Sequence, residues 1–115
     1  MNLYLSLQRP FVADHYHDLP GFVEERHGHN WEAEATFPVR DGEGEAACAE
    51  ALDAWVAQVD YTLLNAQDGI LGRNPTAEAL AQWLFRFLEG RGLAPARVRV
   101  REKVNYWAAC TRPDA

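Results

Sequence analysis

The chain has 115 residues, of which 48% are hydrophobic and 24% charged, and its formal net charge is −6 at pH 7. This length and composition are typical of one globular domain, which we expect to span residues 1–115. The acidic balance argues against a nucleic-acid binder or a protein of membrane surfaces, because such proteins normally carry a basic face. No apolar run approaches the roughly 18 residues of a membrane-spanning helix. The two cysteines match no zinc or redox spacing, so we expect a reduced, cytoplasmic protein.

Alternating apolar residues predict two strands in the first third of the chain. Residues 2–8 place three leucines on one face, and residues 29–39 alternate aromatic or small apolar residues with polar ones. The stretch from residue 15 to residue 29 carries every histidine and has turn residues at 18–21. A long connection in a small domain is more often functional than idle, so this segment is a candidate site.

The second half predicts two helices and then two strands. Residues 41–44 form a predicted turn, and residues 46–59 carry apolar residues at helical spacing. A second helix begins at Pro75, with Asn74 or Thr76 as the cap, and ends at Gly90. Residues 96–103 alternate again, and a short turn near residues 104–105 leads to a last predicted strand at 106–110. The order strand, strand, helix, helix, strand, strand predicts an α+β fold with both helices on one face of an antiparallel sheet.

The four histidines suggest a metal site. His27 and His29 are two residues apart at a strand start, so both side chains leave the same face. His15 and His17 repeat this spacing at the end of the first strand. If the strands pair, three imidazoles with one open position form the arrangement of a catalytic zinc site. Spacing alone leaves metal-free surface histidines as an equal alternative.

Five short segments resemble motifs of the 6-pyruvoyl-tetrahydropterin synthase family, which includes the 6-carboxytetrahydropterin synthases. They keep the order of the family and span nearly the whole chain. The segments are 11–15 (Phe-Val-Ala-Asp-His), 27–31 (His-Gly-His-Asn-Trp), 59–65 (Val-Asp-Tyr-Thr-Leu-Leu-Asn), 74–78 (Asn-Pro-Thr-Ala-Glu) and 100–102 (Val-Arg-Glu). The resemblance implies the tunnelling fold, a four-stranded antiparallel sheet with two helices on one face. It also implies a homo-hexamer, a dimer of trimers with sites between subunits.

The resemblance also implies a set of site residues. Zinc would be held by His15, His27 and His29, and would act as a Lewis acid on the hydroxyls of the substrate's side chain. The substrate would be 7,8-dihydroneopterin triphosphate. Glu102 would accept paired hydrogen bonds from its amino-pyrimidine edge, and Thr76 would also contact it. Without the family, Glu102 is simply a glutamate at a strand end.

The chain departs from the family at the base. The position of the family's catalytic cysteine holds Val23 or Gly21, depending on the spacing, and neither can take a proton. Glu24, three residues before His27, resembles a subgroup in which glutamate replaces that cysteine and the side chain is cleaved to give 6-hydroxymethyl-dihydropterin. A carboxylate there could act as a general base. The alternative is that it is a solvated loop residue.

A second departure affects proton relay, because the family's Asp-His pair reads Asp60-Tyr61 here. A phenol with a reference pKa of about 10 is a poor relay at neutral pH. With Glu24, Asp60 and Tyr61 as catalytic candidates, we expect a zinc-dependent lyase or aldolase of pterin, folate or deazapurine (queuosine-type) biosynthesis. One alternative is a zinc- and pterin-binding paralogue without this catalysis, acting as a partner subunit. Another is a metal site with unrelated hydrolytic chemistry, which would not require Glu102.

Overall fold

The structure is a computed structural model that describes residues 1–39, 44–70 and 72–113. Its main sheet has the strand order β5-β1-β4-β6-β7, and a two-stranded sheet pairs β2 with β3. The strands are β1 (Tyr4–His15), β2 (Asp18–Leu19), β3 (Phe22–Val23), β4 (His27–Pro38), β5 (Thr62–Leu63), β6 (Arg97–Lys103) and β7 (Tyr106–Thr111). The helices are α1 (Glu45–Val59) and α2 (Ala77–Gly90), with short 3-10 turns at Leu64–Ala66 and Asp68–Ile70.

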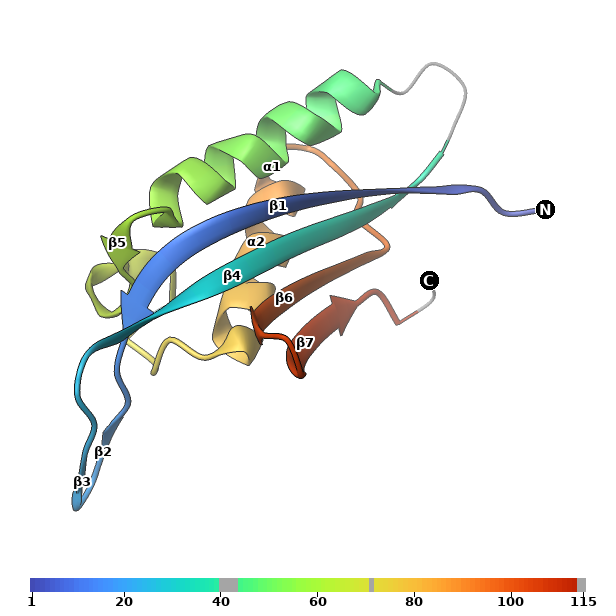
Figure 1. Cartoon of the computed structure of the whole chain (residues 1–115). Helices are drawn as coiled ribbons and strands as arrows, with labels where there is room; N and C mark the ends of the chain where they lie inside the picture. The colour runs from blue at the N-terminus through green and yellow to red at the C-terminus, as the bar shows by residue number, and fades with distance from the viewer. Residues whose placement is uncertain (40–43, 71, 114–115) are drawn as a thin grey trace.

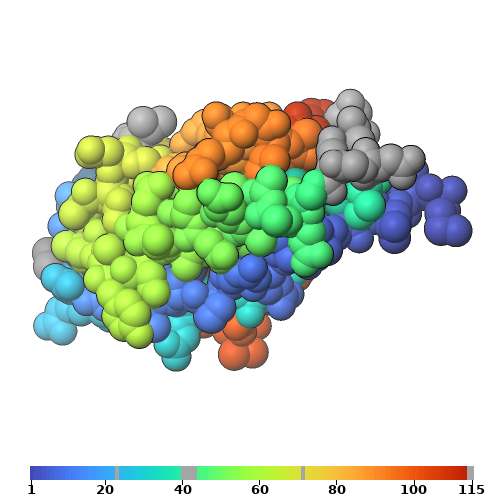
Figure 2. All heavy atoms as spheres, turned by 90° about the horizontal axis from the view of Figure 1, so that it is seen from above, coloured from blue at the N-terminus to red at the C-terminus, as the bar shows by residue number. Residues whose placement is uncertain are grey.

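Both helices cover the same face of the main sheet, as the element order predicts. Helix α1 packs against β1 and β4, and α2 packs against β6 and β7 (Figure 1). Figure 2 shows the two helices side by side over the strands. The predicted α+β fold is therefore confirmed. Of the turn predicted at 41–44, residues 41–43 lie outside the described residues. None of the described helices is both long and apolar enough to cross a membrane.

The sheet differs from the expected four antiparallel strands in one detail. Strand β5 adds a short parallel pairing, with Ala13 opposite Thr62 and Asp14 opposite Leu63. It follows α1 directly, and Asp60 and Tyr61 bind the backbone of β1 just before it. A two-residue strand carries no alternation that could be read from the sequence.

Strand β1 is also longer than predicted, because Pro10 does not end it. The backbone N–H and C=O of Val12 point to the outer edge of β1, where they bond Asp60 and Tyr61. Pro10, two residues earlier, faces the same way, so its missing N–H removes no bond to β4. The strand therefore runs on to His15.

The connection between β1 and β4 is a small hairpin rather than an irregular loop. Asp18 pairs with Val23 and Leu19 with Phe22, around a turn formed by Pro20 and Gly21. Gly21 has a φ of +74°, a left-handed conformation that glycine adopts readily. The hairpin extends beyond the main sheet at the end that carries the histidines (Figure 1).

The core lies between the sheet and the helices and is rich in aromatic rings. Phe11 stacks on Trp31 with centroids 5.8 Å apart, and meets Trp55 edge-on at 5.7 Å. Trp55 in turn contacts Trp83 of α2 at 5.4 Å. The opposite face of the sheet is polar, and there Arg99 holds Glu34 through two bonds of 2.9 and 3.0 Å. The helix-covered face thus has a rigid core that extends to the histidine end.

Candidate metal centre

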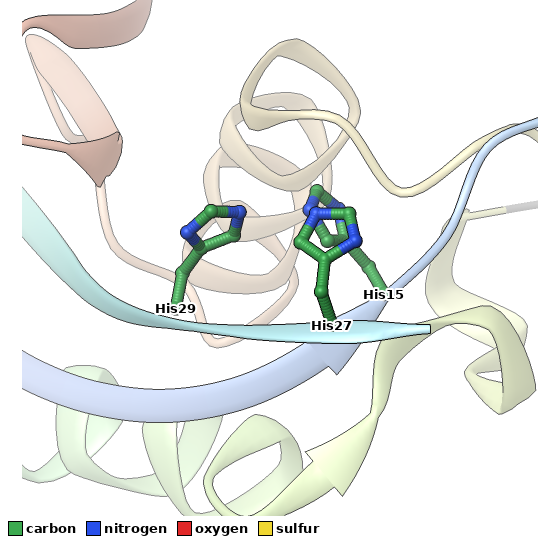
Figure 3. A group of neighbouring side chains, drawn as sticks. All are labelled: His15, His27 and His29. Atoms are coloured by element: carbon green, nitrogen blue, oxygen red, sulfur yellow. The ribbon is translucent and has the colours of Figure 1, made fainter. Parts of the chain in front are cut away.

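The pairing of β1 with β4 brings three histidines together. His15 lies opposite His27, and Ala13 lies opposite His29, so the side chains of His15, His27 and His29 share the helix-covered face. Their ligand nitrogens all lie within 4.8 Å of one another. Figure 3 shows the three rings rising from the same side of the sheet. These are the three histidines that the family resemblance assigns to a metal site.

Backbone carbonyls fix which nitrogen each ring offers. His15 Nδ1 lies 2.8 Å from the carbonyl of Pro75, and His27 Nδ1 lies 2.9 Å from the carbonyl of Glu25. A carbonyl can only accept, so each Nδ1 carries the hydrogen and each Nε2 presents a lone pair. Among the described residues, His15 Nε2 is buried without a hydrogen-bond partner. A buried lone pair of this kind, oriented by a second-shell carbonyl, suits a metal ion.

Burial favours the uncharged form of two of these imidazoles, those of His15 and His29. Desolvation lowers the pKa of His15, and the neighbouring His27 and His29 act in the same direction against the Pro75 hydrogen bond and Glu102. Desolvation also lowers the pKa of His29. A metal ion is coordinated by the neutral form of imidazole, so the lowered pKa values favour metal binding.

Two asparagines fix the backbone on either side of His17. Asn65 accepts from the N–H of Tyr16 at 3.0 Å and donates to its carbonyl at 2.9 Å. Asn74 accepts from the N–H of Asp18 at 2.7 Å and donates to its carbonyl at 3.3 Å. The side-chain amide of each asparagine thus bonds both the N–H and the C=O of one residue, as the backbone of a neighbouring strand would. The sequence placed both asparagines in family motifs, but it gave Asn65 no role and Asn74 only that of a possible helix cap.

Glu24 lies at the edge of the histidine group. Its carboxylate accepts from the backbone N–H of His17 at 2.8 Å and contacts Nδ1 of the same residue at 2.9 Å. It also lies 3.8 Å from His27 Nδ1. The hydrogen bond from the His17 side chain holds the pKa of Glu24 below its usual value. Within the described residues, His17 is outside the group of histidines that could hold a metal ion, and it bonds Glu24 instead.

Three more polar residues converge from β6 and the start of α2. Glu102 Oε1 lies 3.4 Å from His15 Nε2. Thr76, one of the two caps that the sequence allowed, caps α2 and accepts from the N–H of Ala79 at 3.1 Å. Glu78 follows two residues later. The loop that carries the carbonyl of Pro75 thus continues directly into the helix start.

The sequence did not predict the pair formed by Tyr106 and Glu78. The Tyr106 hydroxyl donates to Glu78 at 2.6 Å. This bond raises the pKa of Tyr106 and lowers that of Glu78. The alternation of β7 places Tyr106 on the helix-covered face, which is the only sequence signal for this pair.

Comparison with known proteins agrees with this arrangement. The model of the 6-pyruvoyl tetrahydropterin synthase family matches residues 4–113. The chain belongs to this family. The family assignment supports a lyase-type enzyme of pterin metabolism, and family members depend on a metal. A comparison with curated protein sequences finds no match.

Solved structures of this family have the same fold at low sequence identity. The Caenorhabditis elegans 6-pyruvoyl tetrahydropterin synthase is 14% identical, with a TM-score of 0.83 over 97% of this chain and 96% of that one. The Plasmodium falciparum synthase is 15% identical, with a TM-score of 0.66 over 96% and 98%. A Plasmodium vivax synthase in which a catalytic glutamate is replaced by alanine is 14% identical, with a TM-score of 0.67 over 97% and 98%.

Asp60 and Tyr61, at the position of the synthase family's Asp-His pair, bind the edge of β1. Asp60 accepts from the N–H of Val12 at 2.9 Å, and the N–H of Tyr61 donates to the carbonyl of Val12 at 2.6 Å. Tyr61 is 82% exposed and has a φ of +58°, the left-handed region that L-residues avoid. Neither residue belongs to the histidine group of the described chain. The structure therefore separates these two candidates from the other site residues.

Proposed function

We propose that the chain binds zinc through His15, His27 and His29 and acts on the side chain of 7,8-dihydroneopterin triphosphate. The main support for this proposal is the buried lone pair of His15 Nε2, which has no hydrogen-bond partner among the described residues. Two further imidazoles lie beside it. Three imidazole ligands with an open fourth position are typical of catalytic zinc. Zinc bound there would act as a Lewis acid toward hydroxyls of the substrate side chain.

Glu102 and Thr76 are the proposed pterin contacts. A carboxylate accepts two parallel N–H bonds, which matches the amino-pyrimidine edge of a pterin. The Glu102 side chain is 13% exposed and close to His15, so a ligand held there would lie near the metal ligands. Thr76 belongs to the same short segment as Pro75, whose carbonyl orients His15.

Glu24 is the proposed general base. His17 orients its carboxylate and lowers its pKa, so the group is ionised at neutral pH. It would take the proton of a side-chain hydroxyl, after which the adjacent carbon–carbon bond breaks. The departing fragment becomes a carbonyl compound, and the electron pair stays on the pterin-bearing carbon, which then takes up a proton. The catalytic glutamate of the Plasmodium vivax enzyme supports this role.

The expected product is therefore a 6-hydroxymethyl-dihydropterin, a folate precursor. The 6-pyruvoyl and the deazapurine-type 6-carboxy products are disfavoured because neither Val23 nor Gly21 can replace the missing thiol. We favour the glutamate chemistry because, of the three positions that could hold the family's base (Gly21, Val23 and Glu24), only Glu24 carries an ionisable side chain.

Asp60 and Tyr61 would serve the site of a neighbouring subunit in a hexamer of two trimers. Tyr61 points into solvent, and residues 4–11 of β1 have no pairing partner on their outer edge among the described strands. Such an edge is a template for strand pairing with another copy. Sedimentation or mass photometry would test this, since a monomer at micromolar concentration contradicts the hexamer.

The alternative is a zinc- and pterin-binding paralogue without catalysis. It is favoured by the phenol at Tyr61, which replaces the imidazole of the family's relay. In this reading the site residues would bind the ligand, and the chain would serve as a partner subunit.

The test is to incubate the zinc-loaded protein with dihydroneopterin triphosphate and identify the products by mass spectrometry. We expect a 6-hydroxymethyl product that Glu24→Ala abolishes and that Glu25→Ala, at the adjacent exposed carboxylate, retains. Binding without turnover would favour the paralogue. If His27→Ala leaves zinc content unchanged, the metal assignment is wrong.

A further inference from the structure

Two arginines of β6 are each neutralised by a glutamate directly across from them on β4. Arg99 lies opposite Glu34 and binds it at 2.9 and 3.0 Å, and Arg101 lies opposite Glu32 and contacts it at 3.5 Å. Both pairs lie on the outer face of the main sheet, the face opposite the helices. Side chains on a strand alternate between its faces, so Arg97 is the third arginine of β6 on this face.

Arg97 differs from the other two because the residue across from it is Thr36. The carboxylate that Arg97 contacts is that of Glu34, at 3.5 Å. Arg99 already holds this carboxylate, and Gln8 donates to it at 2.7 Å. One negative charge therefore faces two guanidinium groups. Among the described residues Arg97 has no other ion pair, and its side chain is 44% exposed. Most of its five N–H donors are thus available to a ligand.

Hydroxyl groups lie on both sides of Arg97 in the same row across the sheet. Ser6 of β1 lies opposite Thr36, and Thr111 of β7 lies opposite Arg97. Four neighbouring strands thus supply one side chain each (Figure 1). The hydroxyls of Ser6 and Thr36 share one hydrogen bond of 2.7 Å, which uses one of their two hydrogens. The other hydrogen and the hydroxyl of Thr111 are further donors.

This row lines an open hollow of about 500 Å³ on the outer face of the sheet. Tyr4 and Ala96 complete the wall of the hollow. Small-ligand pockets have volumes of about 300–1,000 Å³, so the hollow can hold more than a single ion. A guanidinium flanked by hydroxyls is a donor set that suits the oxygens of a phosphate group.

We propose that Arg97, Ser6, Thr36 and Thr111 bind the phosphate group of a small ligand. The phosphate would supply the negative charge that a glutamate supplies to each of the other two arginines. The ring of Tyr4 would contact an organic part of the ligand, where there is one. This inference goes beyond the proposed function, since the hollow lies on the face opposite the histidines and shares no residue with the metal centre.

The test measures phosphate binding to the full chain by isothermal titration calorimetry, with chloride holding the ionic strength constant. We expect Arg97→Gln to weaken binding about tenfold or more, because it removes the charged donor. Thr36→Glu should have a similar effect, because it places a carboxylate across from Arg97. Thr36→Gln, which has the same size without the charge, should weaken binding less. Arg91→Gln, at an exposed arginine of the α2 end, is the matched control and should bind phosphate as the wild type does.

A second probe distinguishes the source of the phosphate group. Phenyl phosphate carries an aromatic ring that can lie against Tyr4. Tighter binding of phenyl phosphate than of inorganic phosphate, lost in Tyr4→Ala, would assign the hollow to an organic phosphate. Equal binding of the two probes would assign it to the free ion.

Three results would overturn the proposal. The first is a wild type that binds no phosphate, and the second is an Arg97→Gln variant that binds it as tightly as the wild type. The third is a loss of phosphate binding in His27→Ala that Arg97→Gln does not share, because the phosphate would then lie at the metal centre. Circular dichroism checks that the variants fold, and Arg97→Gln decides the outcome if Thr36→Glu does not. Zinc content, measured separately, tests the proposed function independently of these results.

Discussion

Trp31 packs edge-on against His15, with ring centroids 5.1 Å apart and the ring planes inclined by 81°. The same indole lies 5.8 Å from the ring of His29. Its Nε1 donates to the carbonyl of Ala13 at 3.1 Å, which fixes the ring. One buried side chain thus limits the rotation of two of the three proposed ligands.

We predict that Trp31→Leu weakens zinc binding about tenfold, because His15 and His29 lose a packing surface that restricts their orientation. Trp55→Leu is the control, since Trp55 is equally buried but none of its recorded ring contacts involves a histidine. Both variants should lose about 3 kcal/mol of stability. Zinc titration with a competing chelator measures the difference. Equal affinity in the two variants would show that Trp31 serves only the core.

The asparagine pairs predict a coupled loss of stability and zinc binding. Asn65→Ala leaves the N–H and C=O of Tyr16 without their side-chain partners, which should lower the free energy of unfolding by about 1–3 kcal/mol. Zinc affinity should fall with it because the segment after His15 loosens. Thermal unfolding with and without zinc measures both effects. Asn105→Ala, at an exposed asparagine, is the control and should change neither.

The zinc-free protein should lose stability as the pH falls through about 6.5. The pKa values of His15 and His29 are lowered on folding from a reference of 6.5, chiefly by burial, so the unfolded chain binds protons more readily. Stability is therefore fully present above pH 6.5 and declines as the pH falls toward the lower folded pKa values. Unfolding midpoints between pH 8 and pH 5 test this. A midpoint that stays constant or rises over this range would contradict the prediction.

Glu34 should matter for stability but not for the metal. Its side chain is 5% exposed and receives two bonds from Arg99 and one of 2.7 Å from Gln8. Glu34→Gln should lower stability by about 1–3 kcal/mol because it weakens a shielded charge pair. Zinc affinity should not change, since Glu34 lies on the opposite face of the sheet. Glu32→Gln, which breaks only a 3.5 Å contact with Arg101, should have the smaller effect.

Local patterns were enough to predict the fold. Alternation identified β4 and β6, and helical spacing identified both helices, because each pattern needs only residues within one element. The extent of β1 was missed because Pro10 has the signature of a strand end. A strand can continue through a proline when the proline faces an edge without a pairing partner. Which edge of β1 lacks a partner depends on the whole sheet and not on the local sequence.

In the candidate site, too, local patterns could be predicted from the sequence and contacts between distant segments could not. The spacing of the histidines indicated a metal site, given that their strands pair, and the family resemblance selected His15, His27 and His29 as its ligands. The bonds of Asn65 and Asn74 to a backbone 49 and 56 residues away have no local pattern, and neither does the bond between Tyr106 and Glu78. Asp60 and Tyr61 were recognised by motif. Only the structure shows that they bind the edge of β1, because a sequence motif does not specify which surface its side chains face.

The row of rings from His15 through Trp31, Phe11 and Trp55 to Trp83 gives the protein an internal optical probe. Indoles separated by one ring exchange excitation energy efficiently, so light absorbed at Trp83 can be emitted near the histidines. A paramagnetic ion such as copper(II) in the histidine group would then quench the emission of several tryptophans, beginning with Trp31. Occupancy of the metal centre could thus be followed by intrinsic fluorescence, without a label or an added substrate.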